Sequence, residues 1–176
     1  MNALELSGIC KSFDGFQALD RADFAVRWGE VHALLGENGA GKSSLMNIAA
    51  GLYAPEEGRI LVDDNLVRLS GPREAARHRI GMVHQHFKLV RAFTAAENIL
   101  LGHPLASELG SHRSRLRRLE GLIRAKAAEL GFDLDPGRRV DRMSIAEQQR
   151  VEILKVLMAG ARILILDEPT AVLTDQ

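Results

Sequence analysis

Apolar and polar residues alternate along the first part of the chain, a pattern typical of strands that bury one face. Turn-forming residues such as Gly29, Pro55 and Gly58 separate the alternating runs. The segments predicted as strands are residues 4–10, 22–26, 30–35, 59–62 and 80–83. One helix is predicted among them, at residues 43–50, because its apolar residues have helical spacing and Gly51 provides a stop.

The apolar residues take up a helical period after Lys88. The segments predicted as helices are residues 95–101, 116–130 and 144–158. The second carries an apolar stripe along one face, and the third is apolar around much of its girth and is therefore predicted to be buried. A short apolar run at residues 162–166 predicts a strand of a parallel sheet covered on both faces. The order of elements predicts an α/β fold.

The composition excludes some classes of protein but does not identify a function. The chain has 176 residues, of which 46% are apolar, and this suits one domain with a packed core. Lysine and arginine total 23, as do aspartate and glutamate, so no net charge attracts the chain to nucleic acid or anionic lipid. Cys10 is the only cysteine, and no apolar run approaches the ~20 residues that span a bilayer. Any affinity for phosphate must therefore come from a local site.

The strongest local signal is the sequence Gly-Glu-Asn-Gly-Ala-Gly-Lys-Ser, which matches the phosphate-binding pattern G-x-x-x-x-G-K-[ST]. A predicted strand precedes it and a predicted helix follows it, so backbone N–H groups would face the phosphates of a nucleotide. Lys42 would reach the β- and γ-phosphates, and the Ser43 hydroxyl would ligate Mg²⁺. The ATP-binding residues predicted here are Gly36, Glu37, Asn38, Gly39, Ala40, Gly41, Lys42, Ser43 and Ser44. The alternative is a glycine-rich turn before a helix.

Two carboxylates follow the last predicted strand. Asp167 and Glu168 come directly after residues 163–166, and the carboxyl end of such a strand opens on the ligand crevice of an α/β sheet. Asp167 would hold Mg²⁺, whereas Glu168 points elsewhere because side chains alternate along a strand. Glu168 would orient or deprotonate the water that attacks the phosphate. The alternative is a polar turn that ends the strand at Pro169.

Three further motifs resemble those of an ATP-binding cassette (ABC) ATPase domain. Residues 143–150, Met-Ser-Ile-Ala-Glu-Gln-Gln-Arg, lie where that family has its L-S-G-G-Q signature. Residues 81–87 match its Q-loop, and residues 11–13, Lys-Ser-Phe, match its aromatic A-loop. The order of the motifs agrees from residue 4 to the end of the chain.

The resemblance narrows to one group of ABC proteins. The segments similar to the ATPases of simple-sugar and nucleoside importers are residues 81–102, 148–155 and 167–174. Those ATPases commonly carry two cassettes in one chain, and this sequence would match the front of the first. The implied fold is a P-loop NTPase of the ABC ATPase type. Its mixed sheet core would comprise residues 1–88 and 142–176, and its helical signature subdomain residues 89–141.

The resemblance also implies roles for single residues. Phe13 would stack on adenine, with Phe16 as a nearby competitor, and residues 89–98 would lie near the coupling helix of a membrane partner. The implied catalytic residues are Lys42, Gln85 and Glu168. The implied Mg²⁺ ligands are Ser43, Gln85 and Asp167. The implied signature residues, which face the nucleotide of a second cassette, are Ser144, Ile145, Ala146 and Glu147. Ser144 and Glu147 also fit a capping box, so a purely structural role stays open.

The chain departs from the family pattern in two ways. Ile145 and Ala146 replace the glycines of the signature, and Glu147 places a carboxylate where glutamine is usual. The family's switch histidine, expected after Glu168, is absent, and Thr174 stands where the D-loop has aspartate. These departures predict a C-terminally incomplete cassette that alone binds ATP poorly and hydrolyses it very slowly or not at all.

Three hypotheses follow. The first is the ATPase subunit of a sugar or nucleoside importer, peripheral on the cytoplasmic face of the cell membrane. Its partners would be ATP, a second cassette (a homodimer or a tandem copy) and transmembrane permease subunits. The second is a non-transport ABC protein, disfavoured because the middle of the chain is short and the net charge is zero. The third is a truncated cassette that binds nucleotide or a partner without turnover. No nucleic-acid partner is expected.

Two weaker patterns are given structural interpretations. His84 and His86 have a spacing that can bind a metal, but no third ligand accompanies them. The basic run at residues 112–118 is interleaved with an apolar stripe, so it is predicted to be the solvated face of a helix.

Overall fold

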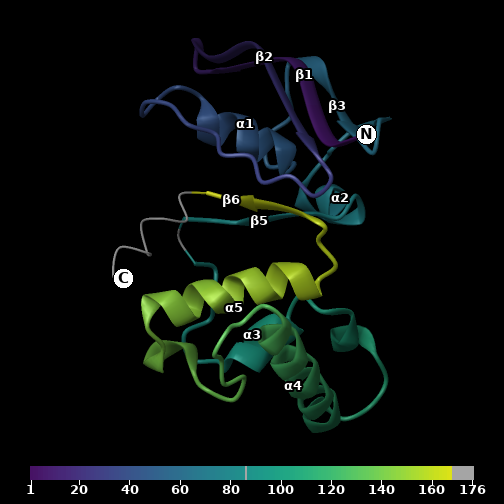
Figure 1. Cartoon of the computed structure of the whole chain (residues 1–176), viewed down its shortest axis with the longest axis vertical. Coiled ribbons are helices and arrows are strands. Elements are labelled where there is room, and N and C mark those ends of the chain that lie inside the picture. Colours follow the sequence, from purple (N-terminus) through teal and green to yellow (C-terminus); the bar gives the residue numbers. More distant parts are fainter. Residues whose placement is uncertain (86, 168–176) are drawn as a thin grey trace. The chain divides into compact units, whose positions relative to one another are not determined.

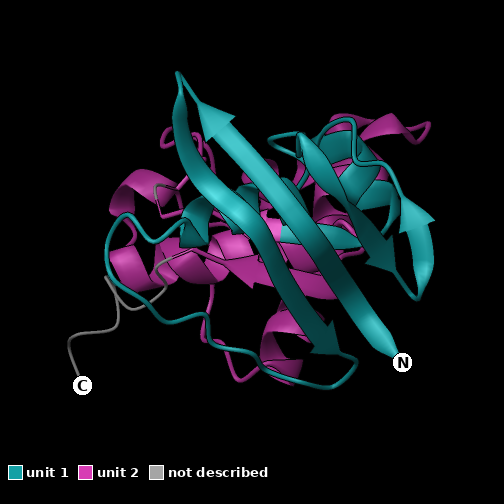
Figure 2. Ribbon diagram, turned by 90° about the horizontal axis from the view of Figure 1, so that it is seen from above, with its two compact units in different colours: residues 1–81 teal, residues 82–176 magenta. Residues whose placement is uncertain are grey.

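The computed structural model describes residues 1–85 and 87–167. The chain consists of two compact units, Met1–Gly81 and Met82–Gln176, which are drawn in teal and magenta in Figure 2. Glu168, Pro169 and Thr174 lie outside the described residues, as does His86.

The first unit is built on an antiparallel sheet. Its four strands lie in the order β2-β1-β3-β4. Their bounds are β1 Asn2–Phe13, β2 Phe16–Arg27, β3 Glu57–Val62 and β4 Asn65–Val67. The two long strands β1 and β2 form a hairpin, seen as the paired arrows in Figure 2. Leu4, Leu6 and Ile9 of β1 are buried with Ile60 of β3, so the predicted alternation becomes the core face of this sheet.

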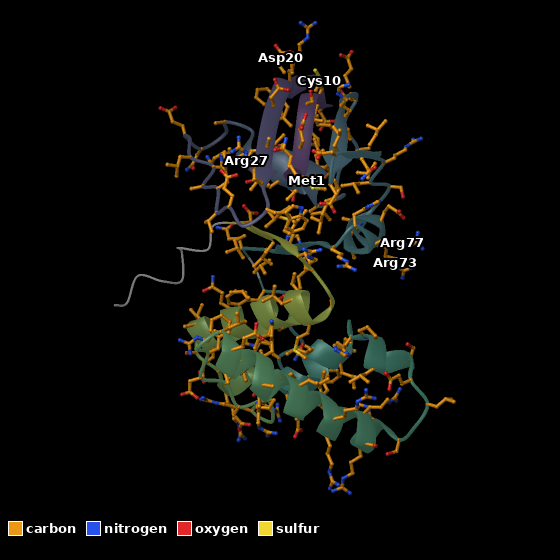
Figure 3. The ribbon with its side chains drawn as sticks, turned by 45° about the vertical axis from the view of Figure 1, so that its right-hand side comes forward. Met1, Cys10, Asp20, Arg27, Arg73 and Arg77 are labelled. Atoms are coloured by element: carbon orange, nitrogen blue, oxygen red, sulfur yellow. The ribbon has the colours of Figure 1, made fainter. Side chains whose placement is uncertain are left out.

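Two helices belong to the first unit. Helix α1, Lys42–Ala49, contacts β1 and β2 and buries Leu45 and Ile48, while Gly51 follows it with a positive φ of 73°. The helix predicted at residues 43–50 is therefore confirmed. Helix α2, Pro72–Arg77, starts with a proline at its first turn. Arg73 and Arg77 are exposed on it and extend outwards in Figure 3.

The strand predicted at residues 30–35 is wrong for the structure described. Residues 30–37 have no regular secondary structure, and Val31 and Leu35 are 99% and 87% exposed. Alternation shows only that a segment can be a strand, because a strand also needs a neighbour to accept its hydrogen bonds. None of the described strands pairs with this segment.

The second unit is mostly helical around its own core. Its regular elements are α3 Ala95–Leu100, a 3₁₀ turn at Pro104–Ser107, α4 His112–Glu129, a 3₁₀ turn at Val140–Arg142 and α5 Ile145–Met158. The core contains Ile99 from α3, Leu119 and Ile123 from α4, and Val151 and Leu154 from α5. Helices α3, α4 and α5 contact one another, as Figure 1 shows.

Helix α4 confirms the predicted stripe and begins earlier than predicted. Leu119, Ile123 and Ala127 are buried along one face. The helix begins at His112 because the Ser111 side chain accepts a hydrogen bond from the Ser114 backbone N–H. Its first turn, residues 112–115, is therefore helical although it carries no apolar residue.

Strands β5, Ile80–Val83, and β6, Ile163–Leu166, form a two-stranded sheet. Ile163 and Ile165 of β6 are buried, whereas Leu166 is 40% exposed. The prediction that β6 is covered on both faces is therefore only partly correct, since its burial follows a period of two.

The start of α3 is bonded to the segment that leads into α5. Phe93 O accepts from the Val140 N–H at 2.9 Å, and Arg91 O accepts from the Asp141 N–H at 2.9 Å. Thr94 and Arg139 form a β-bridge. Residues 91–96 and 136–141 are consequently joined through their backbones, although some 45 positions separate them.

Buried Asn98 stabilises the turn before α3. Only 2% of this residue is exposed. Its Oδ1 accepts from the Val90 N–H at 2.7 Å, and its Nδ2 donates to Val90 O at 3.1 Å and Thr94 O at 3.0 Å. The buried amide thus uses both its oxygen and its nitrogen in hydrogen bonds, and it provides the acceptor for the Val90 N–H.

Among the described residues, no helix combines the length and the apolar character needed to cross a membrane.

Candidate functional site

The phosphate loop, residues 36–43, runs from an irregular segment into the first turn of α1. Gly39 and Gly41 have positive φ angles of 86° and 81°, and Gly41 is the N-cap residue of α1. No hydrogen bond from a side chain caps this helix end within the described structure. Its first N–H groups and the positive end of its dipole are therefore available to an anion.

The Lys42 side chain folds back over this loop. Its Nζ donates to Gly36 O and to Glu37 O, each at 2.7 Å. Two carbonyl oxygens of the loop thus hold the ammonium group, and no ion pair with an acidic side chain of the described residues accompanies them. A phosphate oxygen carries a full charge and would be a stronger acceptor for the same ammonium group.

Gly41 lies against strand β2. A Cβ atom at this position would be 2.6 Å from Ala18 O and 2.8 Å from Leu19 Cδ2. Only a residue without a side chain allows the loop to approach the strand this closely. The sequence reasoning missed Ala18 and Leu19, which no motif includes.

Phe13 lies near the tip of the β1–β2 hairpin. Its ring makes an edge contact with Tyr53 at a centroid distance of 5.1 Å, and Lys11 Nζ is 5.4 Å from its centroid. Phe16 is its register partner across the hairpin and is 68% exposed. The two aromatic rings thus differ in their surroundings, since Tyr53 and Lys11 contact the ring of Phe13 whereas most of Phe16 is exposed. Tyr53 was not predicted as part of this cluster.

Gln85 and Asp167 are brought to one edge of the β5–β6 sheet. The Asp167 N–H donates to Val83 O at 3.1 Å, so the carboxyl ends of the two strands are adjacent. Gln85 follows β5 by two residues and Asp167 follows β6 directly. Amide and carboxylate oxygens are donors that suit Mg²⁺, and so is the exposed hydroxyl of Ser43 in the first unit.

The donor set suits a cation held only partly by protein. The described residues contain no group of three or more His, Cys, Asp or Glu that could hold a metal ion. Mg²⁺ in nucleotide sites has one or two protein ligands and completes its shell with phosphate and water. The assignment of Ser43 in the first unit and of Gln85 and Asp167 in the second as Mg²⁺ ligands stays a prediction from the family resemblance.

His84 adjoins the same edge. Burial lowers the pKa of its imidazole, and the Lys88 ammonium lowers this pKa further, while the Asp167 charge acts in the opposite direction. Its Nε2 lies 3.1 Å from Lys88 Nζ, so the neutral ring can accept a hydrogen bond from that ammonium group. No described residue supplies the further ligands that a His84 metal site would need.

Ser144 is the N-cap of α5 in a complete capping box. Its side chain accepts from the Glu147 N–H at 3.2 Å, and Glu147 Oε2 accepts from the Ser144 N–H at 2.8 Å. The capping box predicted from sequence is confirmed. Ile145 is 60% exposed at the same helix end.

Arg138 neutralises the unusual carboxylate of the signature. Its Nη1 donates to Glu147 Oε1 at 2.6 Å, and its Nη2 donates to Arg142 O at 2.5 Å. The pKa of Glu147 is lowered, first by the backbone hydrogen bond from Ser144 and also by the charge of Arg138. No sequence motif predicted Arg138 as a partner of Glu147.

A phosphate loop at a helix N-terminus, an acid at the end of a strand and a capped signature helix define the class as an ATP-binding cassette. Residues 19–171 match the family model described as ABC transporter. The chain belongs to the ABC transporter family.

Several relatives extend along nearly the whole chain. The nucleoside import ATP-binding protein NupA of Lactococcus lactis subsp. cremoris (strain MG1363) is 46% identical over 97% of this chain. A putative ribose/galactose/methyl galactoside import ATP-binding protein of Rhizobium meliloti (strain 1021) is 47% identical over 98%. The guanosine import ATP-binding protein NupO of Bacillus subtilis (strain 168) is 47% identical over 97%. In each case the match covers 33% of the relative, so this chain spans about a third of their length.

Solved structures give the same result for the fold. The ADP conformation of MJ1267, an ATP-binding cassette of an ABC transporter, aligns with a TM-score of 0.81 at 26% identity, covering 97% of this chain and 70% of that one. CbiO1 from Clostridium perfringens aligns with a TM-score of 0.77 at 27% identity, over 97% and 66%. The predicted ABC ATPase fold class is therefore confirmed, as is the resemblance to sugar and nucleoside import ATPases.

Proposed function

We propose that this chain is the nucleotide-binding part of the ATPase subunit of an importer for simple sugars or nucleosides. The observation that carries the proposal is the phosphate loop. Lys42 is held at its mouth by two backbone carbonyls, and α1 follows it without a side-chain cap. This arrangement offers backbone N–H groups and one ammonium group to a polyphosphate.

Each site residue has a proposed task in ATP hydrolysis. Lys42 contacts the β- and γ-phosphates, and Phe13 packs against adenine. Mg²⁺ held by Ser43, Gln85 and Asp167 would neutralise charge on the phosphates of the bound nucleotide. Glu168 orients the attacking water, and this role rests on the family resemblance because Glu168 lies outside the described residues.

The proposed partners follow from the relatives. All three import proteins named above are described as ATP-binding proteins of import systems. A structural neighbour, the cassette MJ0796, is described as dimeric in a post-hydrolysis state bound to ADP and Pi, with a TM-score of 0.75 at 28% identity. We therefore propose a second cassette and membrane permease subunits as partners, at the inner face of the membrane. The proposed nucleotide-binding core is residues 1–88 and 142–176, with residues 89–141 as the signature subdomain.

Calorimetric titration of the chain with ATP tests the central claim. Binding is expected in the presence of Mg²⁺ and weaker in EDTA. Lys42→Ala is expected to weaken it by about tenfold to a hundredfold, the range for losing a charged hydrogen bond. Lys126→Ala removes an ammonium group from α4, far along the chain, and is the matched control with unchanged affinity.

The outcomes separate the hypotheses. Absence of Mg²⁺-dependent binding, or equal binding by the Lys42→Ala chain, would contradict the proposal. Binding with phosphate release that Glu168→Gln abolishes supports an ATPase. Binding without release, with or without a second cassette, identifies a nucleotide-binding module instead.

A further inference from the structure

Helix α5 holds both backbone groups of Lys88. Glu152 Oε1 accepts from the Lys88 N–H at 2.6 Å, and Lys155 Nζ donates to Lys88 O at 3.2 Å. Glu152 Oε2 and Lys155 Nζ form an ion pair at 2.7 Å, one helical turn apart. Lys88 and Glu152 are 64 positions apart, so this contact joins two distant parts of the second unit.

Glu152 is an unusual residue to find here, because it is only 4% exposed. A buried carboxylate is costly unless it is paired and hydrogen-bonded, and both of its oxygens are used in that way. An apolar residue at this position would leave the Lys88 N–H and the Lys155 ammonium group without their acceptor. The carboxylate is therefore tied to the position of Lys88.

The held residue closes a short loop that contains Gln85. At one end, Val83 O accepts from the Asp167 N–H at 3.1 Å. At the other end, Lys88 is bonded to α5, and its own Nζ lies 3.1 Å from His84 Nε2. Gln85 thus lies between two anchored positions.

The same helix carries the signature at its other end. Ser144 is the N-cap of α5, and Glu152 lies eight positions further along. At 1.5 Å per residue, this separation is about 12 Å along the helix axis. Ser144 and Glu152 thus belong to one continuous helix, which connects the loop of Gln85 to the signature position.

We propose that Glu152 and Lys155 are positioning residues that fix the loop of Gln85 to the signature helix. This role rests on the proposed nucleotide function, since Gln85 is assigned there to the Mg²⁺ of bound ATP. The pair holds Lys88 by its backbone, so the link does not depend on the side chain at position 88. It allows the occupied state of one nucleotide site to be transmitted to the helix end that faces the nucleotide of a second cassette.

Amide hydrogen exchange of the whole chain, resolved by residue with NMR, tests this link. The variants are Glu152→Ala, which removes the acceptor, and Glu152→Gln, which keeps an oxygen for the Lys88 N–H. Glu129→Ala is the matched control, because Glu129 forms an ion pair with Lys126 at the same spacing but is exposed on α4. Exchange is measured at Lys88, Gln85, Ala40 and Lys42, with and without Mg²⁺ and the analogue ATPγS.

Without nucleotide, the Lys88 amide is expected to exchange about tenfold faster in Glu152→Ala, the effect of one lost hydrogen bond. Glu152→Gln is expected to restore its protection, which a loss of overall stability would not do. With nucleotide, Ala40 and Lys42 should be protected in every variant, whereas Gln85 should lose its protection in Glu152→Ala only. In turnover with a second cassette, the same variant should lower kcat with little change in KM.

Three results would overturn the inference. Unchanged exchange at Lys88 in Glu152→Ala would show that the link does not exist. Normal nucleotide-induced protection of Gln85 in that variant would show that the link does not position the loop. Absence of protection at Ala40 and Lys42 in the unmodified chain would overturn the nucleotide function itself, and this role with it.

Discussion

Replacing Gly41 by alanine should destabilise the first unit far more than the same change at Gly39. Both glycines have similar positive φ angles, 81° and 86°. A Cβ at position 41 would be 2.6 Å from Ala18 O, whereas a Cβ at position 39 would meet nothing within 4 Å. The two variants therefore share a backbone cost and differ in a steric one.

The magnitudes can be worked out separately. A non-glycine residue in the left-handed region costs about 1–2 kcal/mol. Forcing an additional carbon into a packed site costs about 1–3 kcal/mol more. Gly39→Ala should thus lower the free energy of unfolding by about 1–2 kcal/mol and Gly41→Ala by about 2–5 kcal/mol.

Urea unfolding monitored by tryptophan fluorescence measures the difference in the free energy of unfolding of the first unit between the two variants. Trp28 is the only tryptophan in the chain, and it lies in the first unit together with both glycines. Calorimetry with Mg²⁺-ATP adds a second measurement, because the loop of Gly41→Ala must move away from β2. Equal losses of stability in the two variants would refute the steric reasoning, and so would a larger loss for Gly39→Ala.

Three further predictions concern other parts of the chain. Asn98→Ala removes three side-chain hydrogen bonds from the turn before α3, including the one donated by the Val90 N–H, and should lower the free energy of unfolding by about 2–3 kcal/mol in urea unfolding followed by circular dichroism. Asn65→Ala, in an exposed position, should lower it by less than about 0.5 kcal/mol, and equal losses would contradict the role of Asn98. The lowered pKa of Glu147 stabilises the folded state above the unfolded pKa of about 4.3, and this stability is lost as the pH falls through the folded pKa. Glu147→Gln should therefore lower the free energy of unfolding by about 1 kcal/mol at pH 7 and by progressively less as the pH falls through the folded pKa, and a loss that does not change with pH would contradict the capping account. Phe13→Ala should weaken ATP binding by about tenfold, the effect of losing one stacked ring, while Phe16→Ala should change it less than twofold; the reverse order would assign the stacking to Phe16.

Local patterns predicted the elements whose stability is local. The helix that starts at Ser144 was predicted from a cap and an apolar period, and its capping box is present in the structure. The helix after the phosphate loop was predicted from its apolar spacing and from Gly51 as a stop. In both cases the residues that decide the structure lie close together in the sequence.

Other features depend on partners that are distant in the sequence. Residues 30–35 have the alternation of a strand but no described strand beside them, so the pattern misled. Glu152 occupies a helical position typical of a surface residue, yet its partner is a backbone N–H 64 positions away. Arg138 likewise precedes the signature without belonging to its motif. The spacing of apolar and polar residues cannot predict such contacts, because the backbone groups that take part in them are the same at every residue.

Backbone hydrogen bonds join residues 91–96 to residues 136–141, so the chain between them is a long connection with fixed ends. Because both ends of this connection are fixed, its length can change without a change in the direction of α5. Doubling the length of a flexible loop costs only about 0.6 kcal/mol in closure entropy. The segment around Leu109, a fully exposed residue, is thus a site where inserted residues would lengthen the protein without moving Ser144.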